Sequence, residues 1–344
     1  MSVSFKYIEK DRTGMSIQEL VQRDTRASVS SNGSAPPVIE IAHLRKEYGT
    51  TVAVDDVSFA VHRGEIFGIL GRNGAGKTTT VECITGLRRP DRGEISVFGL
   101  DPRRDRHELH ERVGVQLQDS ALPDLLRVRE AVELYASFYR EPADGRELIA
   151  TLGLQDAEHM YFKHLSGGQK QRLSIVLALI GQPEIAVLDE LTTGLDPEAR
   201  RDTWRLIEGV RARGVTIVLV THFMEEAERL CDRVALIDHG RMVALDRPGA
   251  LALAATTSKR IRLTATEPFP DVLLSALPEV SAVEHHGPEV VVAGSGDLVT
   301  AVVLALHRAG IHAEDVQIET ANLEDAFLAL TDETTHGDTN GVTR

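Results

Sequence analysis

The sequence predicts an α/β protein with a mainly parallel sheet at its core, followed by a smaller α+β domain. Three observations predict this class. Short apolar runs of strand type alternate with helical stretches between residues 38 and 250, which is typical of a parallel sheet covered by helices. A glycine-rich loop joins one of these runs to a helix. After Leu251 the pattern changes to a second, shorter set of strands and helices.

Composition places the 344-residue chain among ordinary globular proteins, with 42% hydrophobic and 26% charged residues. Its 38 basic and 52 acidic residues give a net charge of −14, which argues against a nucleic-acid partner because such proteins carry a basic face. Two cysteines, Cys83 and Cys231, are too few for a disulfide framework or a zinc site. No apolar run approaches the roughly 18 residues of a membrane-spanning helix.

The first 37 residues are polar and end in a run of Ser, Gly and Pro, which predicts a flexible N-terminal extension. Met15 is a second possible start. From Val38 onward the β-rich and apolar runs indicate an ordered domain that extends to residue 250. Its strands are predicted at 38–44, 52–59, 65–70, 185–188 and 216–220, with a helix at 77–85.

The region after Leu251 is predicted to be a separate domain of ferredoxin-like type, covering 251–331. Its elements follow the order β-α-β-β-α-β, which is the split pattern of that fold. The strands are predicted at 260–264, 280–284, 290–293 and 316–319, and the helices at 271–277, 298–309 and 323–330. Residues 332–344 are predicted to be a polar tail.

Residues 71–78 match the phosphate-loop motif G-x-x-x-x-G-K-[ST], with a strand before and a helix after. Glycines let several backbone N–H groups point at one phosphate chain, and the helix presents its positive end to the same group. Lys77 is predicted to reach the β and γ phosphates, and the Thr78 hydroxyl to bind Mg²⁺. The predicted nucleotide-binding residues of this loop are Gly71, Arg72, Asn73, Gly74, Ala75, Gly76, Lys77, Thr78 and Thr79.

A second candidate site follows the apolar strand at 185–188, which runs directly into Asp189 and Glu190. An apolar strand that ends in a carboxylate is the Walker B arrangement, in which Asp189 would hold Mg²⁺. Glu190 is then placed to accept a proton from the attacking water. Together with the phosphate loop, these residues predict hydrolysis of ATP to ADP and phosphate.

Between the two motifs lies the sequence LSGGQ, formed by Leu165, Ser166, Gly167, Gly168 and Gln169. Ser166 is predicted to cap a helix from about Gln169 to Ile180, whose exposed positive end is a second anion-binding terminus. LSGGQ is the signature of the ATP-binding-cassette (ABC) family, which this chain resembles over residues 38–250. The resemblance implies that these signature residues cap the γ phosphate bound by a second cassette, so that two cassettes form a head-to-tail homodimer or heterodimer.

Other family elements appear in the expected order. Tyr48 resembles the aromatic residue that stacks on adenine, and Asp196 lies in a segment similar to the D-loop. Gln118 resembles the Q-loop glutamine that contacts Mg²⁺ and water, although Gln116 is a rival for this role. His222 resembles the switch histidine near the γ phosphate. The resemblance thus implies a catalytic set formed by Glu190, His222 and Gln118. It also implies a metal-binding set formed by Thr78, Gln118 and Asp189, so that Gln118 belongs to both sets.

Two positions depart from the family pattern. Leu191 follows the catalytic glutamate where the family usually has proline, which would fix φ near −65° and stiffen the turn. Leucine loosens the turn but removes no catalytic group. Arg72 replaces a common proline in the phosphate loop, and its backbone groups remain available.

The ferredoxin-like domain and the ending at 322–331 resemble the daunorubicin-resistance type of exporter ATPases, which work with separate type-2 permease chains. This narrower resemblance implies a peripheral subunit on the cytoplasmic face of the membrane that powers export of a drug, antibiotic or other amphiphile. Lipid or polysaccharide export, import, a soluble cassette in translation or DNA repair, and nucleotide sensing without turnover are the alternatives. The transported compound and the permease are not visible in this sequence.

Overall fold

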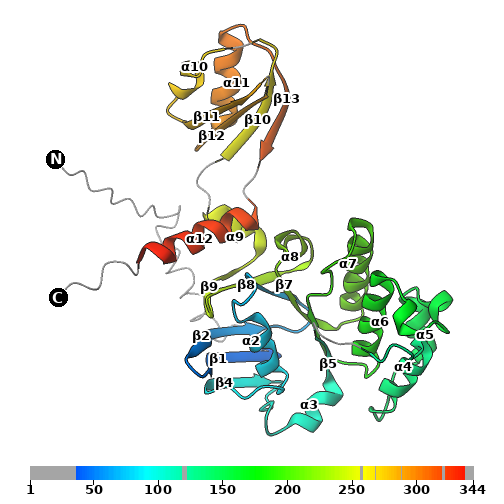
Figure 1. Ribbon diagram of the computed structural model, residues 1–344. Coiled ribbons are helices and arrows are strands. Elements are labelled where there is room, and N and C mark those ends of the chain that lie inside the picture. The colour runs from blue at the N-terminus through cyan, green and yellow to red at the C-terminus, as the bar shows by residue number, and fades with distance from the viewer. Residues whose placement is uncertain are drawn as a thin grey trace, which may run out of the picture. The chain divides into compact units, whose positions relative to one another are not determined.

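The computed structural model describes residues 36–117, 122–255, 259–267, 269–287, 289–319 and 322–337 (Figure 1). The chain divides into two compact units, Met1–Pro248 and Gly249–Arg344. The N-terminal extension predicted over 1–37 lies almost entirely outside the described residues, and so does Gln118.

A six-stranded sheet forms the centre of the first unit, with the strand order β5-β6-β7-β3-β8-β9. The first five strands in this order are parallel, and β9 pairs with β8 in the antiparallel sense. The middle strands are apolar and fully buried, as a sheet covered on both faces requires. The strands are β3 (Ile66–Leu70), β5 (Val113–Gln116), β6 (Ile185–Asp189), β7 (Thr216–Thr221), β8 (Arg233–Asp238) and β9 (Arg241–Asp246).

A smaller antiparallel sheet with the order β2-β1-β4 lies beside the phosphate-loop side of this core. Its inward-facing residues join the buried cluster of the parallel sheet, and the rings of Phe59 and Phe67 stack with centroids 4.9 Å apart. The strands are β1 (Ile39–Tyr48), β2 (Thr51–Val61) and β4 (Arg92–Val97).

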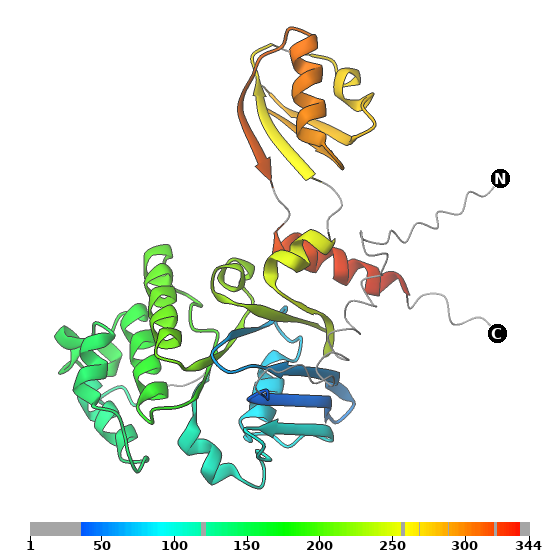
Figure 2. The same ribbon diagram turned by 180° about the vertical axis from the view of Figure 1, so that it is seen from behind.

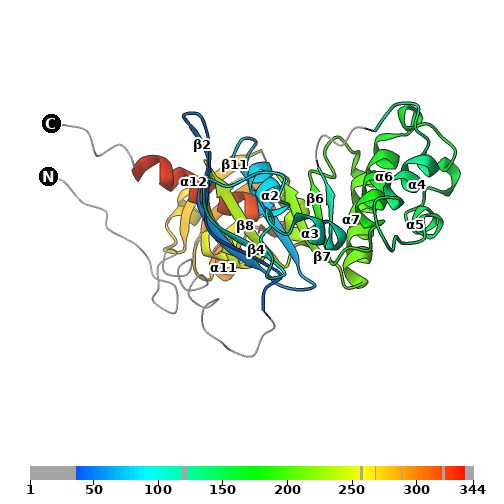
Figure 3. The same ribbon diagram turned by 90° about the horizontal axis from the view of Figure 1, so that it is seen from below.

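One group of helices in the first unit, α4, α5 and α6, lies at one end of this unit in Figures 1 and 3. Helix α2 lies away from this group, beside the small antiparallel sheet. The helices are α2 (Lys77–Ile84), α3 (Arg106–Arg112), α4 (Val128–Ala136), α5 (Gly145–Thr151), α6 (Gly167–Leu179), α7 (Pro197–Ala212) and α8 (Met224–Leu230), with short 3₁₀ segments at Gln155–Ala157 and Phe162–His164.

The second unit contains a four-stranded antiparallel sheet with the order β11-β12-β10-β13. Two helices, α10 and α11, cover one face of it (Figure 2), and Ile261, Val292 and Val302 are among the residues buried there. This is the ferredoxin-like arrangement that the sequence predicts. The elements are α9 (Pro248–Ala255), β10 (Lys259–Ala265), α10 (Val272–Ser275), β11 (Val280–His286), β12 (Glu289–Gly294), α11 (Leu298–Arg308), β13 (Ala313–Glu319) and α12 (Leu323–Gly337).

Two helices of this unit differ in their bounds from the sequence-based expectation. The helix predicted at 271–277 is the single turn α10, since Asp271 and Ala276 flank it as caps. The last helix, α12, continues to Gly337, so the first part of the predicted polar tail is helical.

Candidate functional site

The candidate site lies where the central strands of the first unit end. Strands β6, β7 and β3 are parallel neighbours, so their carboxyl ends meet at one edge of the sheet. Gly71 follows β3, Glu190 follows β6 and His222 follows β7. Open parallel sheets bind ligands at this edge. Three segments that are far apart in the sequence are thereby brought together.

The phosphate loop turns tightly between β3 and α2. Gly74 and Gly76 have φ values of 82° and 101°, a region that residues with a Cβ rarely adopt. A Cβ on Gly76 would also overlap the carbonyl oxygen of Ala53, and a Cβ on Gly71 that of Ile237. The conformation therefore favours glycine at Gly74 and Gly76, and the close backbone packing requires it at Gly71 and Gly76.

Lys77 is the first residue of α2, and its side chain is 4% exposed. Its ammonium group donates to the carbonyl oxygens of Gly71 at 2.9 Å and Arg72 at 3.1 Å, and lies 3.8 Å from Oε1 of Glu190. Burial lowers the pKa of Lys77, while the charges of Glu190 and Asp189 oppose this shift. The loop thus holds a buried cation at the strand ends.

Asp189 is completely buried at the end of β6. Its Oδ2 accepts a hydrogen bond from the Thr78 hydroxyl at 3.4 Å, whereas Oδ1 has no hydrogen-bond partner within the described residues. Burial and the neighbouring charge of Glu190 raise the pKa of Asp189 to about 6, and Thr78 and Lys77 oppose this rise. The Asp189 carboxylate oxygen and the neighbouring Thr78 hydroxyl oxygen are both hard ligands, which Mg²⁺ prefers.

These oxygens would not surround a metal ion alone. Among the residues that the structure describes, no group of three or more His, Cys, Asp or Glu side chains could hold a metal ion. Mg²⁺ usually keeps several waters and shares its remaining positions with substrate phosphates, so two protein oxygens fit this ion.

Glu190 has a left-handed backbone, at φ 51°, although it carries a side chain. Its N–H donates to the carbonyl oxygen of Val220 at 2.9 Å, which ties the turn after β6 to β7. Its Oε1 lies 3.3 Å from Nδ1 of His222. The His222 ring in turn packs on the Phe223 ring, with centroids 4.0 Å apart. Glu190 therefore lies between a cation and an imidazole, and its side chain is 7% exposed.

The two glutamines that compete for the Q-loop role differ in what the structure describes. Gln118 lies outside the described residues. The buried side chain of Gln116 accepts a hydrogen bond from the Asp189 N–H at 3.1 Å and donates to the carbonyl oxygen of Leu117 at 2.8 Å. Gln116 thus joins the ends of β5 and β6, and Gln118 stays a prediction.

The remaining predicted residues lie on other segments. Tyr48 ends β1 and is 41% exposed, and its ring is flanked by the cationic groups of Lys46 at 5.3 Å and Arg88 at 5.5 Å. Thr79 is half-buried in the first turn of α2. Asp196 caps α7 by accepting from the backbone N–H groups of Glu198 and Ala199. Arg72 and Asn73 are exposed, while Ala75 is buried and its carbonyl oxygen accepts from Gly240.

The signature residues form the N-terminus of α6. Ser166 accepts from the Gln169 N–H at 3.2 Å, and the Gln169 side chain accepts from the Ser166 N–H at 2.9 Å, which is a capping box. A Cβ on Gly167 or Gly168 would meet the nearest atoms of this chain only at 3.6 Å, an ordinary contact. Packing within the chain therefore does not explain these glycines. Figures 1 and 3 place α6 away from α2.

Sequence reasoning missed a buried polar cluster behind the site. The Glu226 side chain in α8 is completely buried, and its Oε1 accepts from the Trp204 indole N–H at 3.0 Å. No motif marks these two residues. The only signal available in the sequence is a glutamate in the first turn of a helix that begins just after His222.

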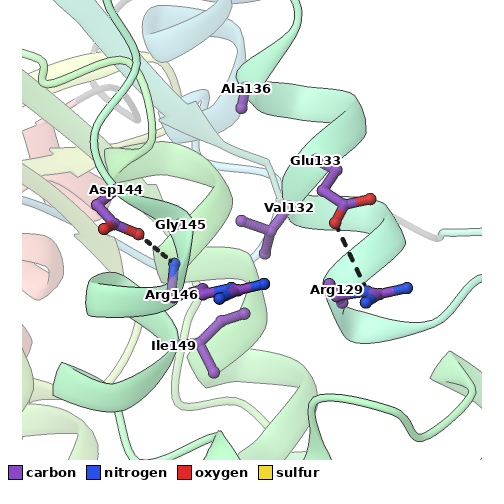
Figure 4. Close-up of a pocket in the computed structure, with 8 residues that line it drawn as sticks. All are labelled: Arg129, Val132, Glu133, Ala136, Asp144, Gly145, Arg146 and Ile149. Atoms are coloured by element: carbon purple, nitrogen blue, oxygen red, sulfur yellow. Dashed lines mark hydrogen bonds and ion pairs between the residues drawn. The ribbon is translucent and has the colours of Figure 1, made fainter.

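A separate hollow of about 380 Å³ lies between α4 and α5 (Figure 4). Three of its four charged side chains are engaged, since Arg129 pairs with Glu133 at 3.5 Å and Asp144 accepts from the Arg146 backbone N–H. It contains neither a glycine-rich loop nor a strand end, so it is not a candidate nucleotide site.

The chain is similar in sequence to known proteins. The profile of the ABC transporter family matches residues 54–193. The Nod factor export ATP-binding protein I of Burkholderia orbicola (strain AU 1054) is 38% identical over 304 residues, which are 85% of this chain and 96% of that protein. The daunorubicin resistance ATP-binding protein DrrA3 of Streptomyces coeruleorubidus is 35% identical over 306 residues, covering 86% and 96%.

Solved structures agree with the sequence relatives. The ATP-binding subunit of an ABC transporter superposes with a TM-score of 0.57 at 30% identity, covering 63% of this chain and 92% of that one. A dimeric ATP-binding cassette in a post-hydrolysis state, bound to ADP and phosphate, superposes with a TM-score of 0.55 at 26% identity and covers 61% and 98%. On its sequence relatives, its fold and the residues at its strand ends, this chain belongs to the ABC transporter family, as an ATP-hydrolysing subunit.

Proposed function

We propose that this chain hydrolyses ATP with the residues at the ends of β3, β6 and β7, and that this reaction powers export of an amphiphilic compound through separate permease chains. The convergence of Lys77, Glu190 and His222 within 3.3–3.8 Å carries the chemical part of the proposal. The names of the relatives, which refer to Nod factor export and daunorubicin resistance, support the class of transported compound.

The roles of the residues follow from their placement. The loop amides and the Lys77 ammonium neutralise charge that develops on the γ phosphoryl group. Glu190 accepts a proton from the attacking water, and its Oε1 lies 3.8 Å from the Lys77 ammonium group. His222 donates a hydrogen bond toward the phosphate from the ring edge that does not face Glu190. The exposed ring of Tyr48 offers a flat surface for the adenine.

Thr78 and Asp189 are the residues that would hold Mg²⁺, with Gln118 as a third contact. When bound, this ion supplies neutralisation of phosphate charge. The Asp189 oxygen without a partner supports the assignment, because a buried carboxylate that stays unpaired is costly.

A second copy of the cassette completes the site in this proposal. The capped, exposed N-terminus of α6 offers backbone N–H groups to an anion, and the bare Gly167 and Gly168 permit close approach. A phosphate held by the partner cassette is the occupant that we propose. The dimeric cassette with ADP and phosphate among the structural relatives supports this arrangement.

A groove in the first unit is the proposed contact with the permease. It has a volume of about 460 Å³, and it exposes the side chains of Leu87 (43%) and Phe138 (66%) beside Tyr135 and Leu117. Within the described residues, no helix has the length and apolar character needed to cross a membrane. A chain that powers export therefore needs a membrane partner, and an apolar segment of that partner would cover these rings.

Turnover and dimerisation test the ATPase part together. Glu190→Gln should lose about 10²- to 10⁴-fold in kcat, because a positioned base is removed, while ATP binding persists. In that variant MgATP should convert the monomer to a dimer in analytical ultracentrifugation, and MgADP should not. Unchanged turnover would overturn the role of Glu190, and a monomer at saturating MgATP would overturn the shared site.

Co-purification tests the membrane part. The tagged chain, pulled down from gently solubilised native membranes, should bring a polytopic membrane protein with it. Phe138→Asp should weaken this co-purification and leave the soluble ATPase rate unchanged. Leu134→Asp is the matched control, since Leu134 is an exposed leucine of α4, four residues before Phe138, but does not line the groove. Recovery of the chain alone, or with ribosomes or DNA, would move the function to the soluble cassettes.

A further inference from the structure

A buried carboxylate behind the catalytic edge has no part in the proposed chemistry. Glu226 lies in α8, four residues after His222, and is 0% exposed. Burying a carboxylate is unfavourable unless other groups compensate it. One compensating group is the Trp204 indole, whose N–H donates to Oε1 at 3.0 Å. Trp204 belongs to α7, so this hydrogen bond joins two helices.

The same two segments meet at a second point. The guanidinium of Arg200 lies 4.6 Å from the centroid of the Phe223 ring, which itself packs on the His222 ring at 4.0 Å. Arg200 and Trp204 are four residues apart and share one face of α7. Phe223 caps α8 and lies almost one helical turn before Glu226. Two contacts, one turn apart, therefore fix the segment that carries His222 against α7.

Groups near Glu226 connect it to both strand ends. Burial raises the pKa of the Glu226 carboxyl, and the hydroxyls of Thr221 and Thr192 lie near enough to oppose this rise, although neither completes a hydrogen bond with Oε2 among the described residues. Thr221 accepts from the Phe223 N–H at 3.0 Å. Thr192 lies two residues after Glu190 and is completely buried. The carboxylate thus lies between the turn of Glu190 and the segment of His222.

We propose that Glu226 is a positioning residue of the ATPase site, which together with Trp204 locks α8 to α7 and so holds His222 against Glu190. This inference rests on the proposed roles of His222 and Glu190. Glu226 itself touches no reacting atom in this proposal. Its effect is on geometry, and a misplacement of about 1 Å can cost roughly a hundredfold in rate.

The test uses single variants of the full-length chain, with kcat, KM and nucleotide affinity measured separately. Trp204→Phe keeps the ring and removes the N–H, so kcat should fall roughly ten- to a hundredfold while nucleotide affinity changes by less than about twofold. Glu226→Ala should do the same. Glu226→Gln keeps an acceptor for the indole and should retain kcat within about threefold.

Glu208→Gln is the matched control. Glu208 pairs with Arg229 at 3.1 Å and also joins α7 to α8, but both side chains are at least 40% exposed. Exposed pairs contribute little, so kcat should stay unchanged. Circular dichroism melting checks that each variant is folded. If Glu226→Ala does not fold, Trp204→Phe and Glu226→Gln decide the outcome.

A double-mutant cycle separates positioning from a general structural role. In a His222→Ala background, Trp204→Phe should cause no further loss of the residual kcat, because the group that it positions is already absent. Folded Trp204→Phe with kcat within twofold of wild type would overturn the proposal, and so would losses that multiply in the double variant. If Glu190→Gln itself leaves turnover unchanged, the proposed site roles fail instead.

Discussion

The buried Asp189 is expected to destabilise the cassette at neutral pH, and its removal should show this. Its pKa is raised from 3.8 to about 6 in the folded chain. A group whose folded pKa is raised contributes stability that is complete below the unfolded value of 3.8 and is lost as the pH rises through about 6. A shift of about two units corresponds to about 3 kcal/mol of lost stability at pH 8. At pH 5 the same relation gives roughly half of that loss.

Asp189→Asn removes the ionisable group and keeps an oxygen that can accept from Thr78. The buried amide adds a polar cost of about 1 kcal/mol, which does not depend on pH. We therefore expect the variant to be more stable than wild type by about 2 kcal/mol at pH 8 and by about 0.5 kcal/mol at pH 5. The difference of roughly 1.4 kcal/mol between the two pH values is the sharper quantity, because the amide cost cancels.

Urea unfolding followed by tryptophan emission measures this free energy of unfolding. Trp204 is the single tryptophan of the sequence and belongs to the first unit, so the signal reports on the cassette. Asn remains a weaker ligand for Mg²⁺, and MgATP should stabilise wild type far more than the variant. A variant that is less stable at both pH values, or whose gain does not grow between pH 5 and pH 8, would refute the reasoning.

Three further predictions concern nucleotide binding and the signature. Lys77→Ala should weaken ATP affinity about tenfold or more in equilibrium titration, because it removes charged hydrogen bonds, and an unchanged Kd would contradict the phosphate-loop role. Tyr48→Ala should weaken ATP affinity about three- to tenfold, whereas Tyr48→Phe should keep it, if ring stacking is what the residue provides. Gly168→Ala should keep or raise Tm, since the Cβ has room and alanine favours a helix, yet it should lower kcat and MgATP-dependent dimerisation. Gly209→Ala, with open space around its Cβ in α7, is the control and should leave kcat unchanged.

Short apolar runs in the sequence predict the buried strands of the fold. The apolar run before Gly71 and the run before Asp189 each form a buried strand, since a continuous apolar run suits a strand covered on both faces. The β8–β9 hairpin was not predicted. Its strands flank a turn at His239 and Gly240, and each strand begins with an arginine, so neither start reads as an apolar strand.

Contacts between distant segments are what the sequence could not predict. Trp204 and Glu226 are 22 residues apart on different helices, and neither belongs to a recognisable motif. Their hydrogen bond exists because β6, β7 and their following helices pack side by side. Similarly, spacing along the sequence favours Gln118 over Gln116 for the Q-loop role. It cannot show that the Gln116 side chain accepts a hydrogen bond from the Asp189 backbone N–H. Pairings of this kind depend on the tertiary fold.

The turn that carries Glu190 combines these local and distant contributions. A left-handed backbone at a residue with a side chain costs about 1–3 kcal/mol and persists only where its surroundings fix it. The expectation that Leu191 loosens the turn considers only φ, whereas the Leu191 side chain is completely buried, and burying leucine contributes about 2 kcal/mol. The Glu190 N–H bonds to Val220, and Thr192 is buried beside Glu226. Packing thus restrains the turn where the family usually relies on proline, and the carboxylate stays between Lys77 and His222.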